Sequence, residues 1–203
     1  MKMQKKNFNL IEQYRKSWNY LAECKYFIFY VIVIFLLFVL IGYFVKAPDS
    51  LAEIIFKYLK DIELKTRGFS QIDWMGFIFL NNLISSFLVL ILGFFFGIYS
   101  IIGAIANGYM VGFVAHFAVS QQGIGSLWKL FPHGIFELPT IFISLGMGLK
   151  LGTFLFQKNK LKSLRYFLVN SLWIFFLIVI PLLIVAAVIE GSLIYFLSSS
   201  TAK

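Results

Sequence analysis

The chain has 203 residues, of which 60% are hydrophobic, 19% aromatic and only 13% charged. An average soluble domain is about 45–50% apolar and about 25% charged, so this composition excludes a water-soluble domain and a disordered chain alike. The net charge of +9 comes from 18 Lys and Arg against 9 Asp and Glu. In a membrane protein such an excess is first a topology signal, so no nucleic-acid partner is needed to explain it.

The first 25 residues precede every long apolar run and carry six basic residues. Within them Ile11, Tyr14, Trp18 and Leu21 recur at helical spacing, which predicts an amphipathic helix. A basic helix of this kind suits the anionic cytoplasmic surface of a bilayer. Residues 1–25 are therefore interpreted as a cytoplasmic, basic, amphipathic segment.

Residues 26–197 are predicted to form a single transmembrane domain. A membrane-spanning helix needs about 20 mostly apolar residues, and five stretches of the chain meet this requirement. They cover approximately residues 26–45, 74–96, 101–119, 131–156 and 167–190. The predicted fold class is all-α, a polytopic transmembrane helical bundle of about five spans.

The loop after the first span contains a second amphipathic pattern, with apolar residues at helical spacing from Leu51 to Ile62. Ser50 and Glu53 fit a capping box at its start, and Gly68 is a suitable stop. We therefore expect an amphipathic interfacial helix over residues 50–66, on the extracytoplasmic side.

Orientation follows from the distribution of Lys and Arg. The link between the fourth and fifth spans carries Lys158, Lys160, Lys162 and Arg165 without any acidic residue. With five crossings this link and the basic N-terminal segment fall on the same side, which the positive-inside rule makes cytoplasmic. We expect a multi-pass protein of the cell membrane with a cytoplasmic N-terminus and an extracytoplasmic C-terminus.

Three consecutive spans carry small residues four apart, the spacing through which membrane helices approach closely. These glycines are Gly93 and Gly97, Gly108 and Gly112, and Gly148 and Gly152. The pattern predicts a tight core of the second, third and fourth spans. The first and fifth spans, rich in Leu, Ile and Phe, are expected to face lipid.

Polar side chains at membrane depth are costly, so their positions are candidate functional sites. The predicted intramembrane polar cluster consists of Asn81, Asn82, Asn107, His133, Glu137 and Glu190. Lys150, near the inner end of the fourth span, is expected to snorkel to the lipid headgroups.

His133 and Glu137 are four residues apart and share one helical face. Four interpretations stay open: a buried hydrogen bond that fixes the start of the helix, a proton- or ion-handling pair, a docking site, or a metal site. Zinc needs three or four ligands, and no catalytic motif is present, so we expect no enzyme activity, cofactor or metal.

Pro132, Gly134 and Pro139 surround this pair. Pro132 suits a helix start, Gly134 permits close approach of another backbone, and Pro139 removes one backbone donor. An irregular or re-entrant start of the fourth span is therefore expected.

These residues resemble the stage II sporulation protein M family. The similarity is most specific from Pro132 to Pro139, together with Asn107-Gly108. The Asn81-Asn82 pair, Gly97 and the Ile189-Glu190-Gly191 segment also fit the family pattern. The resemblance implies an integral membrane protein without known catalytic activity. In endospore formers, it implies an anchor for peptidoglycan-degrading enzymes during engulfment.

Two hypotheses on function follow. The first is a non-enzymatic membrane scaffold or anchor that recruits or positions extracytoplasmic protein partners. The alternative is a small oligomeric transporter or channel that uses the polar cluster around His133 and Glu137. Both place the protein in a lipid bilayer, and the second adds further copies of the chain as partners.

Overall fold

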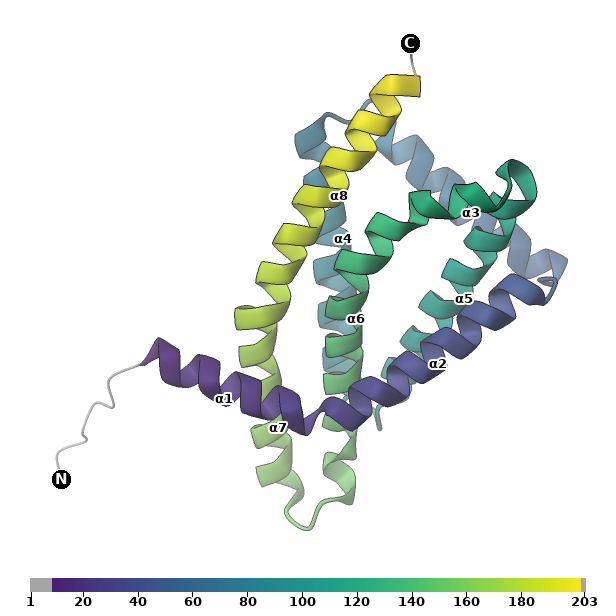
Figure 1. Cartoon of the computed structure of the whole chain (residues 1–203). Coiled ribbons are helices and arrows are strands. Elements are labelled where there is room, and N and C mark those ends of the chain that lie inside the picture. The colour runs from purple at the N-terminus through teal and green to yellow at the C-terminus, as the bar shows by residue number, and fades with distance from the viewer. Residues whose placement is uncertain (1–8, 202–203) are drawn as a thin grey trace, which may run out of the picture.

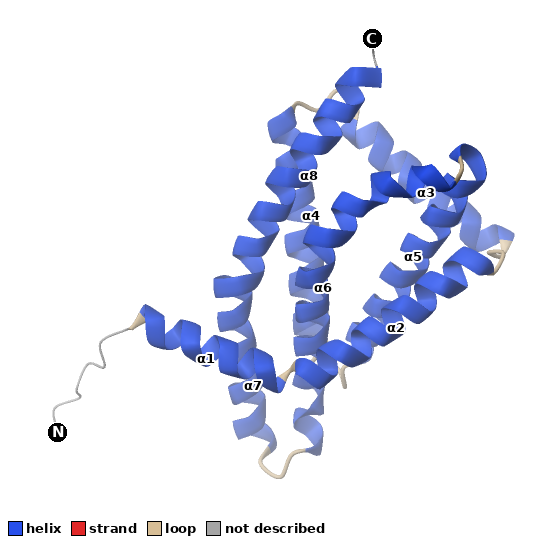
Figure 2. Ribbon diagram, viewed as in Figure 1, coloured by secondary structure: helices blue, strands red, loops and turns tan. Residues whose placement is uncertain are grey.

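The computed structural model describes residues 9–201, without the side chains of residues 129–136 and 197–201. This part of the chain is helical and contains no strand (Figure 2). Five of its helical stretches are long and apolar enough to cross a membrane, which confirms the predicted all-α, five-span bundle. They are Lys25–Phe44 (α2), Gln71–Leu92 (α4), Ile98–Gln122 (α5), Glu137–Phe156 (from α6 into η2) and Lys160–Phe196 (α7, η3 and most of α8).

The spans connect two ends of the molecule (Figure 1). One end, called the basic end here, holds α1 (Leu10–Glu23), the turn 93–97 and the link between η2 (Thr153–Phe156) and α7. The opposite end, called the α3 end, holds α3 (Asp49–Thr66), η1 (Ile124–Leu130) and the end of α8. Toward the α3 end, α2 and α5 lean away from α4, α6 and α8 (Figure 1).

Glycines bring α2 and α5 into backbone contact. A Cβ atom added at Gly108 would collide with the carbonyl oxygen of Phe35, and one added at Gly112 would collide with that of Val39. The prediction that these glycines pack among the second, third and fourth spans was therefore wrong, because they face the first span. Gly42 of α2 faces the backbone of Tyr109 on α5 in the same way, so small residues on both helices allow this close approach.

A second pair, α4 and α6 (Phe131–Gly152), runs parallel. Gly93 lies against Gly148, and Gly97 lies against Gly152, so backbones again meet at small residues. The span through α6 is the most buried of the five, which makes α6 the central helix.

The fifth span also joins this core. α8 (Ile180–Thr201) lies antiparallel to α4, with Gly191 against Met75 and the Gln71 Nε2 atom donating to Ser192 Oγ at 3.0 Å. The expectation that the fifth span faces lipid was wrong, because a larger share of it is buried than of the second or third span. Small buried residues of α8, including Ala186 and Ala187, allow this packing.

The fifth span is one continuous helical rod from α7 (Lys160–Ile174) to α8. Its π-helical turn, η3 (Phe175–Val179), directly precedes the turn that contains Pro181. Proline removes one backbone donor, and local π geometry is a common way to accommodate the freed carbonyl within a membrane.

The capping box lies one helix later than expected. α3 begins after Pro48 without a side-chain cap, so the box predicted at Ser50 and Glu53 was wrong. The box forms instead at α4, where Ser70 Oγ accepts from the Asp73 amide at 3.3 Å and Asp73 Oδ2 accepts from the Ser70 amide at 2.9 Å. Because Pro48 is the N-cap and α3 starts at Asp49, Ser50 already lies inside the helix and cannot cap it.

Candidate functional site

A polar cluster joins three helices in the half of the bundle near the α3 end. Asn82 of α4 is buried and donates through Nδ2 to Glu137 Oε1 of α6. The carboxyl group of Glu190 of α8 lies beside that of Glu137, and Glu190 is only 2% exposed. Three of the six residues of the predicted cluster therefore contact one another across α4, α6 and α8.

Two further members, Asn81 and Asn107, line a cavity beside this contact. The cavity, called the polar cavity here, has a volume of about 360 Å³ and lies between the α2–α5 pair and α4 with α6. Its lining residues come from five helices: Phe35, Tyr58, Asn81, Asn82, Asn107, Met110, Val111, Val114, Glu137, Leu138 and Ile141. Its walls thus combine carboxamide and carboxyl groups with apolar side chains.

The start of α6 carries the motif from Pro132 to Pro139. The side chains of Pro132, His133 and Gly134 lie outside the described residues, but the backbone is helical from Phe131 onward. The 3₁₀ helix η1 leads directly into α6, and the irregular or re-entrant start expected from Pro132, Gly134 and Pro139 stays a prediction. η1 and the first part of α6 run across the α3 end, and α6 then bends into the bundle (Figure 1). Near Pro139, which lies inside α6, Thr140 Oγ1 donates to the Glu137 carbonyl at 2.6 Å.

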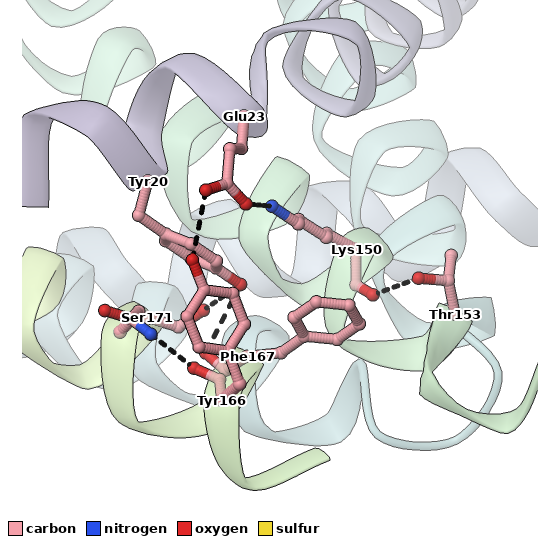
Figure 3. Close-up of polar contacts among 8 residues, drawn as sticks. Tyr20, Glu23, Lys150, Thr153, Tyr166, Phe167 and Ser171 are labelled. Carbon is pink, nitrogen blue, oxygen red and sulfur yellow. Dashed lines mark hydrogen bonds and ion pairs between the residues drawn. The ribbon is translucent and has the colours of Figure 1, made fainter. Parts of the chain in front are cut away.

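A second polar site, which the sequence did not reveal, lies at the basic end (Figure 3). Lys150 Nζ of α6 forms an ion pair with Glu23 Oε2 of α1 at 2.8 Å. It also lies 4.0 Å from the ring centroid of Tyr20 and 5.4 Å from that of Phe167. The Tyr166 hydroxyl donates to the other oxygen of Glu23 at 3.0 Å. The predicted snorkelling of Lys150 was wrong, because α1 covers this residue and supplies its counter-ion.

The helix α1 reaches Lys150 through its less apolar face. Ser17 and Tyr20 are buried, and the Tyr20 hydroxyl donates to the Phe167 carbonyl at 3.3 Å. Ile11 and Trp18 of the predicted apolar stripe are 80% and 58% exposed and point away from the bundle, whereas Leu21 packs against its core. Burial raises the pKa of the Tyr20 hydroxyl above its ordinary value, so this group stays protonated.

Among the residues whose side chains are described, no group of three His, Cys, Asp or Glu is placed to hold a metal ion. The chemistry available in the polar cavity is hydrogen bonding and charge, supplied by carboxamides and carboxyl groups. The chemistry at the basic end is a buried ion pair supported by aromatic rings.

The fold and these sites define a multi-pass helical membrane protein with a polar cavity inside the bundle. Comparison with known proteins gives the family: the model of stage II sporulation protein M matches residues 31–193. The chain therefore belongs to the stage II sporulation protein M family, which confirms the resemblance seen in the sequence.

A relative from Methanocaldococcus jannaschii carries the name of an uncharacterized protein. It is 26% identical over 175 residues, which cover 83% of this chain and 78% of the relative. No solved structure matches the chain.

Proposed function

We propose that the protein is a non-enzymatic membrane scaffold that positions an extracytoplasmic protein partner at its α3 end. Membership of the stage II sporulation protein M family supports a membrane anchor. The bias of basic residues toward the opposite end supports an extracytoplasmic location of the α3 end. The observation that carries the proposal is the surface of α3.

The helix α3 is attached to the bundle along one side only. Ile55 is buried, and the ring of Phe56 lies 5.4 Å from that of Phe113 and 5.1 Å from that of Phe117 on α5. Other apolar side chains of α3 are exposed, including Ile54 at 66% and Leu64 at 58%. They form an apolar surface that the described part of the chain leaves uncovered.

The charges of α3 indicate that its exposed apolar surface binds a protein rather than a lipid surface. The helix has four acidic residues (Asp49, Glu53, Asp61, Glu63) and three basic ones (Lys57, Lys60, Lys65). A helix that binds anionic lipid is instead rich in Lys and Arg on its polar side. Exposed apolar residues among charges of both signs are typical of a protein interface with a polar rim.

Photo-crosslinking of the full chain in its source cells tests this proposal. Crosslinking residues replace Ile54 and Leu64 of α3 and, as matched controls of similar exposure, Leu36 and Leu40 of α2. We expect both α3 positions to capture the same extracytoplasmic protein, both controls to capture lipid, and Ile54→Glu to abolish capture from Leu64. Identical products from α3 and α2 positions would contradict the scaffold role.

A second candidate function is a small oligomeric transporter or channel built on the polar cluster of His133 and Glu137. The polar cavity favours this candidate, because ionisable residues within a membrane are functional sites by default. Proton and potassium flux into dye-loaded liposomes tests it. Flux that Glu137→Gln abolishes and Glu53→Gln on α3 leaves unchanged would support transport, and flux equal to that of protein-free liposomes would contradict it.

A further inference from the structure

The polar cavity presents hydrogen-bond acceptors that the described residues leave open. Asn81 makes no hydrogen bond with any residue whose side chain is described. Asn107 uses one amide donor on the Gly103 carbonyl at 2.8 Å, and its amide oxygen accepts from none of the described residues. The Glu137 carboxyl accepts one bond from Asn82 and keeps further lone pairs. Asn81 and Asn107 are exposed rather than buried in the bundle. At membrane depth the lipid offers such side chains no hydrogen-bond partner, which favours a ligand in the cavity.

The sign of the charge around the polar cavity restricts that ligand. Glu137 lines the cavity beside Glu190, and two neighbouring buried carboxyl groups do not both ionise, so the pair contributes at most one negative charge. No Lys or Arg is among the described lining residues. An anion such as a phosphate group would meet like charge without a donor cluster to compensate. A cation with N–H donors matches the carboxyl and amide oxygens.

The apolar wall and the volume of the polar cavity indicate the character and size of the rest of the ligand. Met110, Val111, Val114 and Ile141 form an apolar wall beside the polar groups. The volume of about 360 Å³ lies within the range of small-molecule sites and exceeds what a single metal ion would fill. It corresponds to roughly a dozen water molecules, which leaves room for an organic group of about ten non-hydrogen atoms.

We propose that the polar cavity binds a small organic amine in its protonated, primary ammonium form. The ammonium group has three donors, and Glu137, Asn81 and Asn107 offer the acceptors, while the apolar part packs against Met110 and its neighbours on α5. This inference deepens the second candidate function, because it rests on the same cavity and names its substrate class. It does not require that the bound amine crosses the membrane.

Binding of phenethylammonium to the full chain in nanodiscs tests the proposal, with 2-phenylethanol and 3-phenylpropionate as uncharged and anionic counterparts. Titration calorimetry should show binding of the amine and of neither counterpart. Glu137→Gln should raise the Kd for the amine at least about tenfold, the effect of losing one charge-assisted hydrogen bond. Glu53→Gln, a matched change at an exposed site on α3, should leave the Kd for the amine unchanged. Titrating this variant also measures how much amine partitions into the nanodisc lipid.

A second variant keeps the proposal testable if Glu137→Gln fails to fold. Met110→Trp fills the polar cavity without touching the carboxyl groups, and we expect it to abolish amine binding. Binding of the alcohol with equal affinity, or amine binding unchanged in Met110→Trp, would overturn the proposal. Amine binding without liposome flux would overturn transport and leave the amine site standing, whereas flux without amine binding would overturn the amine site alone.

Discussion

The ion pair between Lys150 and Glu23 predicts an asymmetric response to mutation. Lys150 has 7% of its side chain exposed, whereas Glu23 has 47%. Glu23→Ala therefore leaves a buried ammonium group without its counter-ion, while Lys150→Met leaves a carboxylate that water can reach. Met keeps most of the packing volume, and Ala keeps the helix propensity of α1.

The magnitudes follow from these exposures. Losing one partner of a buried pair costs about 3–5 kcal/mol, and a desolvated cation–π contact is worth about 2 kcal/mol. Because the rings of Tyr20 and Phe167 remain beside Lys150, we expect Glu23→Ala to lower the free energy of unfolding by about 2 kcal/mol. Lys150→Met should cost about 1 kcal/mol or less, since Glu23 is half exposed and keeps its bond from Tyr166.

Unfolding in mixed micelles of dodecyl maltoside with increasing SDS measures these values. The double variant Glu23→Ala/Lys150→Met should resemble Lys150→Met alone, because the cost of Glu23→Ala comes from the buried charge that the second change removes. Equal destabilisation by the two single variants, or additive losses in the double variant, would refute this reasoning.

Three further predictions concern packing, reactivity and topology. Gly112→Ala should destabilise the fold by about 1–3 kcal/mol, because its methyl group meets the α2 backbone, whereas Gly76→Ala, with no atom within 4 Å, should be neutral or stabilising in the same SDS titration. Cys24 is fully buried, and burial raises the pKa of its thiol to about 12. Maleimide at pH 8 should therefore label Cys24 only after unfolding, and fast labelling of the folded protein would contradict its burial. In intact cells, an impermeant maleimide should label Gly125→Cys and should reach Lys158→Cys only after permeabilisation, and the reverse pattern would invert the proposed orientation.

The spans could be predicted from the sequence because the bilayer imposes a simple rule. Only a helix satisfies every backbone group within the hydrocarbon, so the length of an apolar run determines whether it can span. The same rule made Asn82, Glu137 and Glu190 conspicuous, and these residues do contact one another. The polar cavity beside them could not be predicted, since it depends on how far α2 and α5 lean from α4 and α6.

The sequence could not predict which residues and helices contact each other within the bundle. Lys150 and Glu23 are 127 residues apart, and nothing in either local pattern indicates the other. Gly108 was assigned to the wrong neighbour because a small residue permits close approach without specifying which helix approaches. The contact of α1 with the bundle through Ser17 and Tyr20 was not predicted, because its apolar residues at Ile11 and Trp18 indicated only a bilayer surface.

The close approach of α2 and α6 near the basic end is expected to serve as a pivot for α2. There the backbone of Ile28 lies so near Gly146 that an added Cβ would collide with it, while farther along α2 the two helices separate around the polar cavity. Because glycines lock α2 to α5, the pair is expected to rotate as one body. A rotation of about 10° at Ile28 displaces Val39, about 16 Å along the helix, by about 3 Å. Gly146, which lines no part of the polar cavity, is therefore expected to set its width.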